Sequence, residues 1–426
     1  MTSTHGKNAL FIKKQNEQAL KQLLFRKGPL SRSEIAAELN LSSPAITNIV
    51  GEFIRAGVLR ELPDNEDVSY GIGRRPVKVD FVSEAQLTLG ISLGRDLTHW
   101  SICGLRGEVI RQGILDVMPE NYGEMLDILR AFLDLLKKEE GEVWEKLMGI
   151  CLVMPGYVDA QAGMQKNRGG HEKIDWQDKP LAADVSAITG LPVCCENNVR
   201  ARAYAVQLFR PQLVESLPSY AFCYLNWGIA CPVFMTHAGG SQISSEGEIG
   251  HMIMDPYGIA LPPKNNVPAK KSAWHSIMRN YHGVPGSLEM YSSTYALLEY
   301  CSRAMALGQA PILSSLCPDP EALTPELLWH AQELGDPVVC SNVNRAMSYI
   351  GIALANTVNF LRPGMIFLCG RPFDNPDNTR TVQDSFNRYV FHSNQKEPEF
   401  RVLPSEEYGS AVGACAVGIR RFFLEL

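Results

Sequence analysis

A group of small and polar residues shares one face of a predicted helix near the N-terminus. Apolar residues repeat at intervals of three and four on the opposite face, which is typical of a helix with one buried side: Ile46, Ile49, Val50 and Phe53. Hydroxyl and amide groups on the exposed face can donate and accept hydrogen bonds at the edges of DNA bases. We therefore expect duplex DNA to be contacted by Ser43, Pro44, Thr47 and Asn48.

Two adjacent arginines, Arg74 and Arg75, follow Gly71 and Gly73 in a polar segment between two short apolar stretches. The stretches at 58–62 and 77–81 read as paired strands, so the arginines lie at the tip of a hairpin. Guanidinium groups at such a tip bind the phosphate backbone or enter the minor groove. The segment therefore predicts a DNA-binding wing.

Three predicted helices must position these groups. The first covers 8–27 and ends at Gly28-Pro29, and a short second helix begins at Ser31 or Ser33. Ser42 or Ser43 caps the third, where Pro44 suits the first turn because its missing N–H has no partner there. Two short helices joined by a tight turn, then a hairpin, predict a winged helix-turn-helix domain over residues 1–82. A small helical dimerisation module with a polar loop is the alternative.

Charge divides the chain in the same place. Residues 1–80 carry a net charge of +3, whereas the remainder carries −9 and the whole chain −6. A basic module on an acidic body suits an anionic partner for the first part only.

Composition excludes several classes of protein. Apolar residues make up 45% of the 426, yet no run of 18 apolar residues exists, so no membrane span is expected. The N-terminus lacks the apolar segment of a signal peptide, and we expect a cytoplasmic location. The eleven cysteines form no Cys-x-x-Cys pair, which predicts buried free thiols rather than a cysteine-based metal site.

From Leu87 onward strands and helices alternate, so the fold class of this part is α/β. Within it the sequence Glu246-Gly247-Glu248-Ile249-Gly250-His251 is followed by Asp255–Gly258 and Gly286–Glu289. Supporting pieces are Gly94, Pro155-Gly156, Glu196-Asn197-Asn198 and Gly409–Gly413.

On these motifs the chain resembles the ROK family (repressor, open reading frame, kinase), specifically its winged-helix, sugar-responsive repressors, from about residue 15 to the end. The resemblance implies an actin-like ATPase fold of two α/β lobes over residues 86–426. The small lobe is expected at about 86–200 with the C-terminal helix, and the large lobe at about 201–405.

The resemblance also implies that kinase chemistry is lost. Kinases of the family have an aspartate in the first strand and another as general base, and the matching residues here are Ser92 and Asn198. An amide is a poor proton acceptor, and phosphoryl transfer needs both an oriented nucleophile and charge stabilisation. The matching phosphate loop, 226–231, is short of glycine and contains Trp227. No catalytic residue and no enzymatic activity are expected.

The groups that hold sugar hydroxyls in the family are better retained. The resemblance assigns ligand binding to Asn197, Asn198, Glu248, His251 and Glu289. The family's three zinc cysteines are replaced by Leu261, Pro263 and Ser287, with an insertion at 264–284. One histidine with these side chains cannot hold tetrahedral zinc, so neither a metal nor a cofactor is expected.

Together these features predict a DNA-binding regulator, acting as a repressor, whose effector is a sugar or sugar derivative. Its expected partners are a duplex DNA operator, a small-molecule effector and further copies of the chain, as a homodimer or homotetramer, since winged-helix readers bind paired half-sites. Two alternatives stay open. The second domain is only a platform for dimerisation or a partner protein, or the chain is an active sugar kinase.

Overall fold

The N-terminal part of the chain is a bundle of three helices with a small antiparallel sheet. The computed structural model describes residues 4–63, 76–94, 97–116, 119, 121–166, 177–237, 240–258, 261, 283–392 and 396–425. Helices α1 (Thr4–Lys27), α2 (Arg32–Leu39) and α3 (Ser43–Arg55) have the predicted order. Strands β2 (Leu59–Glu61) and β3 (Lys78–Phe81) form the predicted pair, and β1 (Leu30–Ser31) adds a third strand that we did not predict.

The capping side chains decide between the serines that the sequence left open. Ser31 begins α2, where its hydroxyl accepts from the Glu34 N–H and the Glu34 carboxylate accepts from the Ser31 N–H at 2.7 Å. Ser42, rather than Ser43, begins α3 and accepts from the Ala45 N–H. Each cap satisfies an N–H group that has no partner within its helix.

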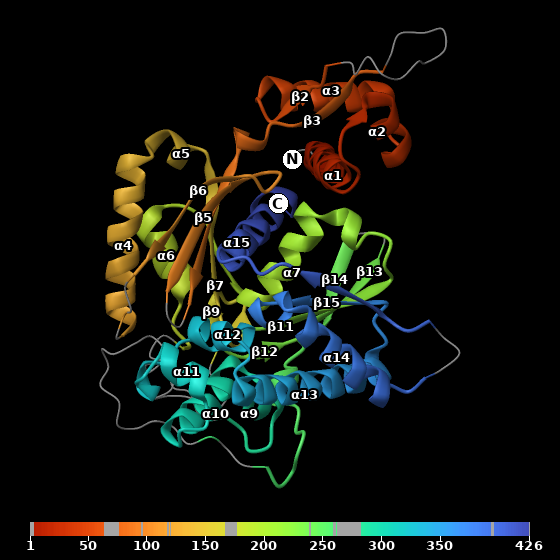
Figure 1. The fold of residues 1–426 in the computed structure, drawn as a ribbon. Coiled ribbons are helices and arrows are strands. Elements are labelled where there is room, and N and C mark those ends of the chain that lie inside the picture. The colour runs from red at the N-terminus through yellow and green to blue at the C-terminus, as the bar shows by residue number, and fades with distance from the viewer. Residues whose placement is uncertain are drawn as a thin grey trace.

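A five-stranded sheet forms the first lobe, in the order β10-β7-β4-β5-β6. Its strands are β4 (Leu87–Leu93), β5 (Thr98–Gly104), β6 (Val109–Leu115), β7 (Leu147–Met154) and β10 (Val193–Asn197). Helices α4 (Tyr122–Glu139), α5 (Gly141–Glu145) and α6 (Leu181–Thr189) pack on one face, and α7 (Asn198–Phe209) and α15 (Gly409–Ile419) on the other (Figure 1). The C-terminal helix therefore returns to the first lobe.

The second lobe is built on a six-stranded sheet, in the order β14-β13-β11-β15-β16 with β12 beside β11. Its strands are β11 (Ser219–Leu225), β12 (Ile229–Ala230), β13 (Val233–His237), β14 (Gly240–Ser245), β15 (Met365–Cys369) and β16 (Glu399–Leu403). Its helices are α9 (Leu288–Ser292), α10 (Thr294–Ala306), α11 (Pro311–Leu316), α12 (Pro325–Glu333), α13 (Pro337–Leu361) and α14 (Pro376–Tyr389).

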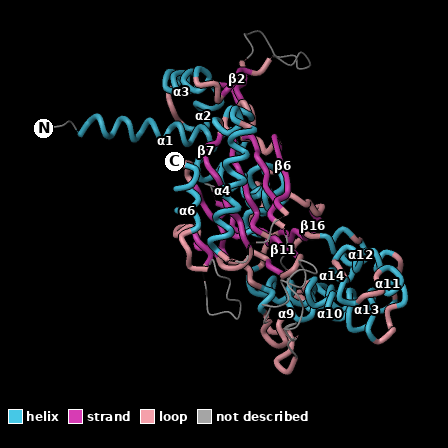
Figure 2. The backbone as a smooth tube through the Cα atoms, turned by 90° about the vertical axis from the view of Figure 1, so that its left-hand side faces the viewer, coloured by secondary structure: helices cyan, strands magenta, loops and turns pink. Residues whose placement is uncertain are grey.

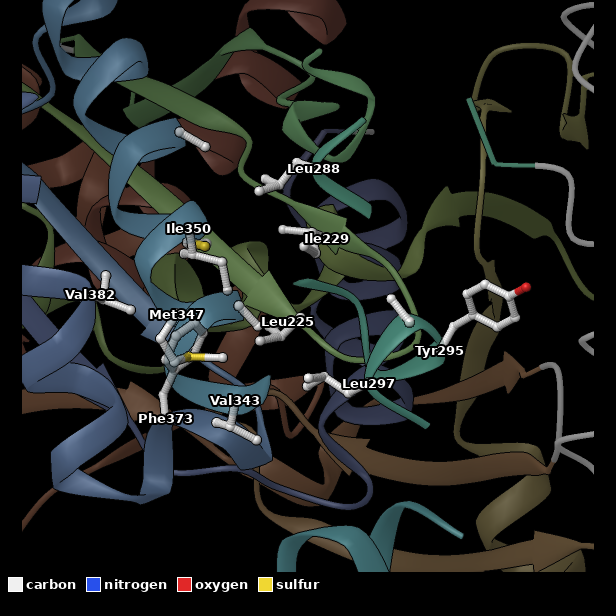
Figure 3. Packing of buried hydrophobic residues seen from close by; sticks show 14 of the residues in the cluster. Leu225, Ile229, Leu288, Tyr295, Leu297, Val343, Met347, Ile350, Phe373 and Val382 are labelled. Atoms are coloured by element: carbon white, nitrogen blue, oxygen red, sulfur yellow. The ribbon is translucent and has the colours of Figure 1, made fainter. Parts of the chain in front are cut away.

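Short elements complete the chain: strands β8 (Val158–Asp159) and β9 (Met164–Gln165); 3-10 turns η1 (Ser83–Ala85), η2 (Pro211–Leu213), η3 (Ile249–His251), η4 (Pro320–Ala322) and η5 (Arg371–Asp374); and the π-helical turn η6 (Arg420–Leu424). The largest core lies under the second sheet. In it the side chains of Ile229 and Leu288 lie next to each other (Figure 3). Ile229 belongs to the expected phosphate loop, and Leu288 directly precedes Glu289 of the expected ligand set.

The N-terminal bundle shares one apolar core with the C-terminal turn. The rings of Phe25 of α1, Phe81 of β3 and Phe423 of η6 pack together in tilted and edge-to-face arrangements, with centroid separations of 4.8 to 6.1 Å. Figure 2 shows α1 running out from this junction, with the C-terminus beside its inner end. The two domains are thus packed against each other rather than merely tethered.

Two further predictions can be compared with the structure. All eleven cysteines are free thiols and all but Cys340 are buried, which confirms that prediction. Among the described residues, no helix is both long and apolar enough to cross a membrane.

Candidate ligand cleft and DNA-binding face

The polar face of α3 is open to solvent. Ser43, Pro44, Thr47 and Asn48 are all exposed, whereas Ile46, Ile49 and Val50 are buried on the opposite face. Phe53 is half-buried against the same core. Hydrogen bonds between these four exposed side chains and the described residues are absent, so their donors and acceptors are available to an outside partner.

The predicted wing can be followed only at its base. Pairing of β2 with β3 continues one step outward, because the Leu62 N–H donates to the Lys78 carbonyl at 2.9 Å. Arg74 and Arg75 lie outside the described residues, so their part in DNA binding stays a prediction.

In the effector domain, Asn197 stands where β10 meets α7. Its Oδ1 accepts from the N–H groups of Val199 and Arg200, at 2.9 and 3.1 Å, and its Nδ2 donates to the Gly156 carbonyl at 2.9 Å. The side chain is buried and caps α7. This predicted ligand residue therefore already has a structural role, which leaves one N–H of the amide for a ligand.

Asn198, the first residue of α7, is different. It is half-buried, and its side chain has no hydrogen bond to any described residue. Ser92, the other position where family kinases carry an aspartate, is buried near the end of β4. Neither side chain provides a carboxylate.

Glu248 precedes the short turn η3, and His251 is its last residue. Gly247, just before it, has φ +71° and is in close contact with Cys231, so that a Cβ there would lie 2.0 Å from the Cys231 carbonyl carbon. Only glycine fits this position, which presses the motif against the phosphate loop. Both side chains are exposed, and neither has a side-chain hydrogen bond within the described part of the chain.

Glu289, at the start of α9, contacts both the phosphate loop and the turn η3. Its Oε1 accepts from the Ile229 N–H at 3.4 Å, and Gly250 is in such close contact that a Cβ there would lie 2.7 Å from the Glu289 Cγ. The Leu288 N–H donates to the Met252 carbonyl at 2.8 Å, which ties α9 to the chain just after His251. Gly250 and Glu289, about forty positions apart in the chain, are thus in contact.

The pKa of Glu248 is influenced by charged side chains near it. Partial loss of hydration raises the pKa of Glu248 above its ordinary range, with the neighbouring Glu289 and Glu246 adding to the rise and His251 opposing it. Glu248 therefore lies near other carboxylates and near His251, and these side chains offer hydrogen-bond acceptors to a polyol.

Several backbone N–H groups of the phosphate loop already have partners inside the protein. The Asn226 N–H donates to the Gly228 carbonyl at 3.0 Å and the Cys231 N–H to the Gly247 carbonyl at 2.6 Å. Pro232 has no N–H, and Ala230 pairs with Tyr224 in the β11–β12 ladder. A phosphate-binding loop needs free amide donors, and in this loop the N–H groups of Asn226 and Cys231 are already engaged.

At the expected zinc position, Leu261 and Ser287 are both buried, while Pro263 lies outside the described residues. Ser287 instead pairs through its backbone with Ile253. Within the described ranges, no group of three or more His, Cys, Asp or Glu lies close enough to hold a metal ion.

Sequence reasoning missed Arg200. Its buried guanidinium donates from Nε to Glu196 Oε1 at 2.6 Å, from Nη1 to Glu246 Oε2 at 2.9 Å and from Nη2 to the Val158 carbonyl at 3.1 Å. Glu196 and Arg200 are four residues apart, but they straddle a strand end and a helix start. No sequence periodicity links either of them to Glu246.

The chain is similar to known proteins over nearly its whole length. DNA-binding transcriptional repressor Mlc of Escherichia coli (strain K12) is 23% identical over 413 residues, covering 95% of this chain and 93% of the relative. The xylose repressor of Bacillus subtilis (strain 168) is 21% identical over 417 residues, covering 97% of each.

Solved structures agree on the fold. A ROK family transcriptional regulator, a homologue of the E. coli Mlc protein, superposes with a TM-score of 0.74 at 21% identity, covering 96% of this chain and 97% of the other. A ROK family glucokinase from Streptomyces griseus, with glucose and AMPPNP, gives a TM-score of 0.60 at 19% identity, covering 78% and 98%. The two-lobed ROK fold is therefore shown, in the form shared by repressors and kinases.

The model of the family described as "ROK family" matches residues 88–420, which span both lobes. The match covers well over half of the chain, and the chain therefore belongs to the ROK family.

Proposed function

We propose that this protein is a sugar-responsive DNA-binding transcriptional regulator, acting as a repressor, without kinase activity. The observation that carries the proposal is the exposed polar face of α3 on a module packed against a two-lobed ROK domain. Relatives named as DNA-binding and xylose repressors, aligned over nearly the full chain, support it.

The cleft supports the absence of phosphoryl transfer. Ser92 and Asn198 provide neither the metal-phosphate anchor nor the general base, and an amide has no usable basicity near neutral pH. The phosphate loop uses its Cys231 N–H on Gly247 and its Ile229 N–H on Glu289. A nucleotide phosphate would have to displace these bonds.

Ligand binding makes weaker demands than catalysis. Glu248, His251 and Asn198 keep side chains without described partners, and hydrogen bonds alone hold a polyol. We propose these with Asn197 and Glu289 as the effector site, in a chain that acts as a homodimer or homotetramer in the cytoplasm, without metal or cofactor. The division into a DNA-binding domain over 1–82 and an effector domain over 86–426 is part of the proposal.

The DNA-binding half is tested by selection of a duplex from a random library with the full chain, followed by titration at several salt concentrations. Arg74→Ala with Arg75→Ala should weaken binding and reduce the salt slope by roughly one unit for each phosphate that is no longer neutralised. Equal affinity in a fragment lacking residues 1–82 would show that the interface lies elsewhere.

The effector half is tested by thermal unfolding against D-glucose, D-xylose, N-acetyl-D-glucosamine and D-glucose 6-phosphate. A ligand that binds only the folded chain should, at a hundred times its Kd, stabilise it by about 2.7 kcal/mol. The stabilisation should disappear in His251→Ala and Glu289→Ala. Coupled assays with ATP and the same sugars should show only background turnover.

One observation favours the alternative platform function. The side chain of Asn197 caps α7 and that of Glu289 bonds the phosphate loop, so two of the five predicted ligand groups already serve the fold. If no sugar shifts the melting temperature while DNA binding is intact, the second domain acts as a dimerisation or partner platform.

A further inference from the structure

A series of ion pairs and hydrogen bonds leads from the cleft toward the DNA-binding module. It begins at Glu246, two residues before Glu248, where Oε2 accepts from Arg200 Nη1 at 2.9 Å. The opposite side of the same guanidinium is held by Glu196 and by the Val158 carbonyl. Arg200 therefore joins the second lobe, through Glu246, to the first lobe, through Glu196.

The two carboxylates hold Arg200 unequally. Glu196 is buried and lies in β10, just before the helix that carries Arg200, so its pair with Arg200 survives any motion between lobes. The Glu246 side chain is half exposed and follows β14 in the other lobe. Glu246 and Glu248 are two residues apart, so a ligand that draws Glu248 inward must also move Glu246. The Arg200 guanidinium then pairs either with Glu196 alone or with both carboxylates. Such an element has two discrete arrangements.

The next step is one helical turn further along α7. Tyr204 lies four residues after Arg200, and the guanidinium carbon of Arg420 stands 4.8 Å from its ring centroid. Arg420 Nε also donates to Glu425 Oε1 at 2.6 Å. Burial, together with the nearby Glu196, raises the pKa of Tyr204, whereas Arg420 and Arg200 oppose the rise. A small cavity opens here between β10, α7 and η6.

Helices α7 and α15 behave as one body. Gly413 is packed so closely that a Cβ there would lie 2.6 Å from the Ala201 carbonyl carbon. Arg202 Nε donates to Ser410 Oγ at 2.8 Å, and its Nη groups donate to the Glu406 carbonyl. A tilt of α7 is therefore passed to α15 and to η6, which continues it.

The series ends at the DNA-binding module. The side chains of Gln18 and Gln22 donate to the Leu424 carbonyl at 2.9 and 3.3 Å, and Lys21 Nζ donates to the Phe423 carbonyl at 3.2 Å. Carbonyls at the end of a helical turn have no partner within it, so they are free to hold α1. In Figure 1 the C-terminus lies between α15 and α1.

We propose that Arg200 and Arg420 are positioning residues that couple the cleft to the DNA-binding module, with the Arg200–Glu246 pair as the part that changes. The biological role of this coupling rests on the proposed function, whereas the physical coupling between the two regions does not. It requires only that breaking the pair at Glu246 loosens η6 and the inner half of α1.

The test measures amide hydrogen exchange in the full chain, which needs neither ligand nor operator. Glu246→Gln removes one charge from a half-exposed position, so the chain still folds. Arg200 itself is unsuitable, because its removal leaves the buried Glu196 carboxylate without its ion-pair partner. We expect Glu246→Gln to speed exchange about fivefold in η6 and in residues 18–27 of α1, and Arg420→Met about tenfold.

Matched variants separate coupling from general loosening. Asp377→Asn breaks the exposed 3.0 Å pair with Arg380 on α14 and should leave η6 and α1 unchanged. Val382→Ala, in the buried core of the second lobe, should speed exchange across that lobe without selecting η6. The double variant Glu246→Gln/Arg420→Met should resemble Arg420→Met alone, since both changes act on one series of interactions.

Unchanged exchange in η6 and α1 for Glu246→Gln, or additive effects in the double variant, would overturn the coupling. If the wild type also selects a duplex and responds to a sugar, the ratio of its DNA Kd values with and without that sugar should fall toward one in both variants. A wild type that selects no duplex would contradict the proposed function, while the exchange rates would still decide the coupling.

Discussion

The proposed DNA-binding face and the proposed ligand site use polar residues in opposite ways. On α3, Thr47 and Asn48 point to solvent and have no described partner. In the cleft, Asn197 caps a helix and Glu289 holds a loop, so the groups assigned to the ligand also support the fold.

The difference follows from how each region is built. The face of α3 comes from one amphipathic helix, and its apolar stripe alone is enough to orient it. The cleft is assembled from a strand end, a turn and two helix starts that lie far apart in the chain. Residues there must first satisfy the backbone groups that these ends leave without partners. Substitutions should therefore separate function from stability on α3 but not in the cleft.

The largest effect is expected where the two regions join. Phe423→Ala removes the ring that packs against Phe25 and Phe81, and truncation of a buried phenylalanine costs about 3–5 kcal/mol. We expect the N-terminal module to melt as a separate, earlier transition in calorimetry. Phe360→Ala, at a ring that is 86% exposed, is the control and should change nothing. A single unaltered transition in Phe423→Ala would mean that the docking is weaker than its burial indicates.

On α3 the expected effect is on binding alone. Asn48→Ala should weaken binding to a selected duplex by about 1–3 kcal/mol, roughly five- to 150-fold, if the amide reads a base edge. The melting temperature should stay the same because the side chain is exposed. Glu84→Gln, an exposed change outside α3, provides the comparison in the same titration. A fall in stability equal to the fall in binding free energy would erase the contrast with the cleft.

A smaller effect tests the cap of α2. Ser31→Ala removes the acceptor for the Glu34 N–H and should lower the free energy of unfolding of the module by about 1 kcal/mol. Ser33→Ala, at the neighbouring serine that does not cap the helix, should cost less. Chemical denaturation of both variants measures the difference, and a larger drop for Ser33→Ala would reverse the assignment.

The smallest effect concerns the cleft and depends on pH. Because the pKa of Glu248 is raised in the folded chain, its ionisation opposes folding as the pH rises from about 4 through that raised value. Glu248→Gln should therefore raise the melting temperature at pH 7, and the gain should shrink toward pH 4. Glu215→Gln, at an exposed carboxylate far from the cleft, serves as reference. A gain that grows on acidification would have the wrong sign.

Much of the N-terminal module could be predicted from the chain. The stripe at Ile46, Ile49 and Val50 has the period of a helix, and the caps are local, so the sequence places the start of α3 to within one residue. Strand β1 escaped prediction because two residues show no periodicity, and it exists only through pairing with β3. In the effector domain, motifs rather than periodicity led to Glu248, His251 and Glu289.

The sequence by itself determined the order of the elements, the helix-turn-helix, the absence of carboxylates at Ser92 and Asn198 and the free, buried state of most cysteines. These depend on residue type and on neighbours within a few positions. Only the tertiary structure decided that Arg200 pairs with Glu246, that the Asn197 amide donates to the Gly156 carbonyl and that η6 holds α1. Each depends on contacts between segments from 40 to 400 residues apart, whose partners are chosen by packing and by the need to pair buried polar groups.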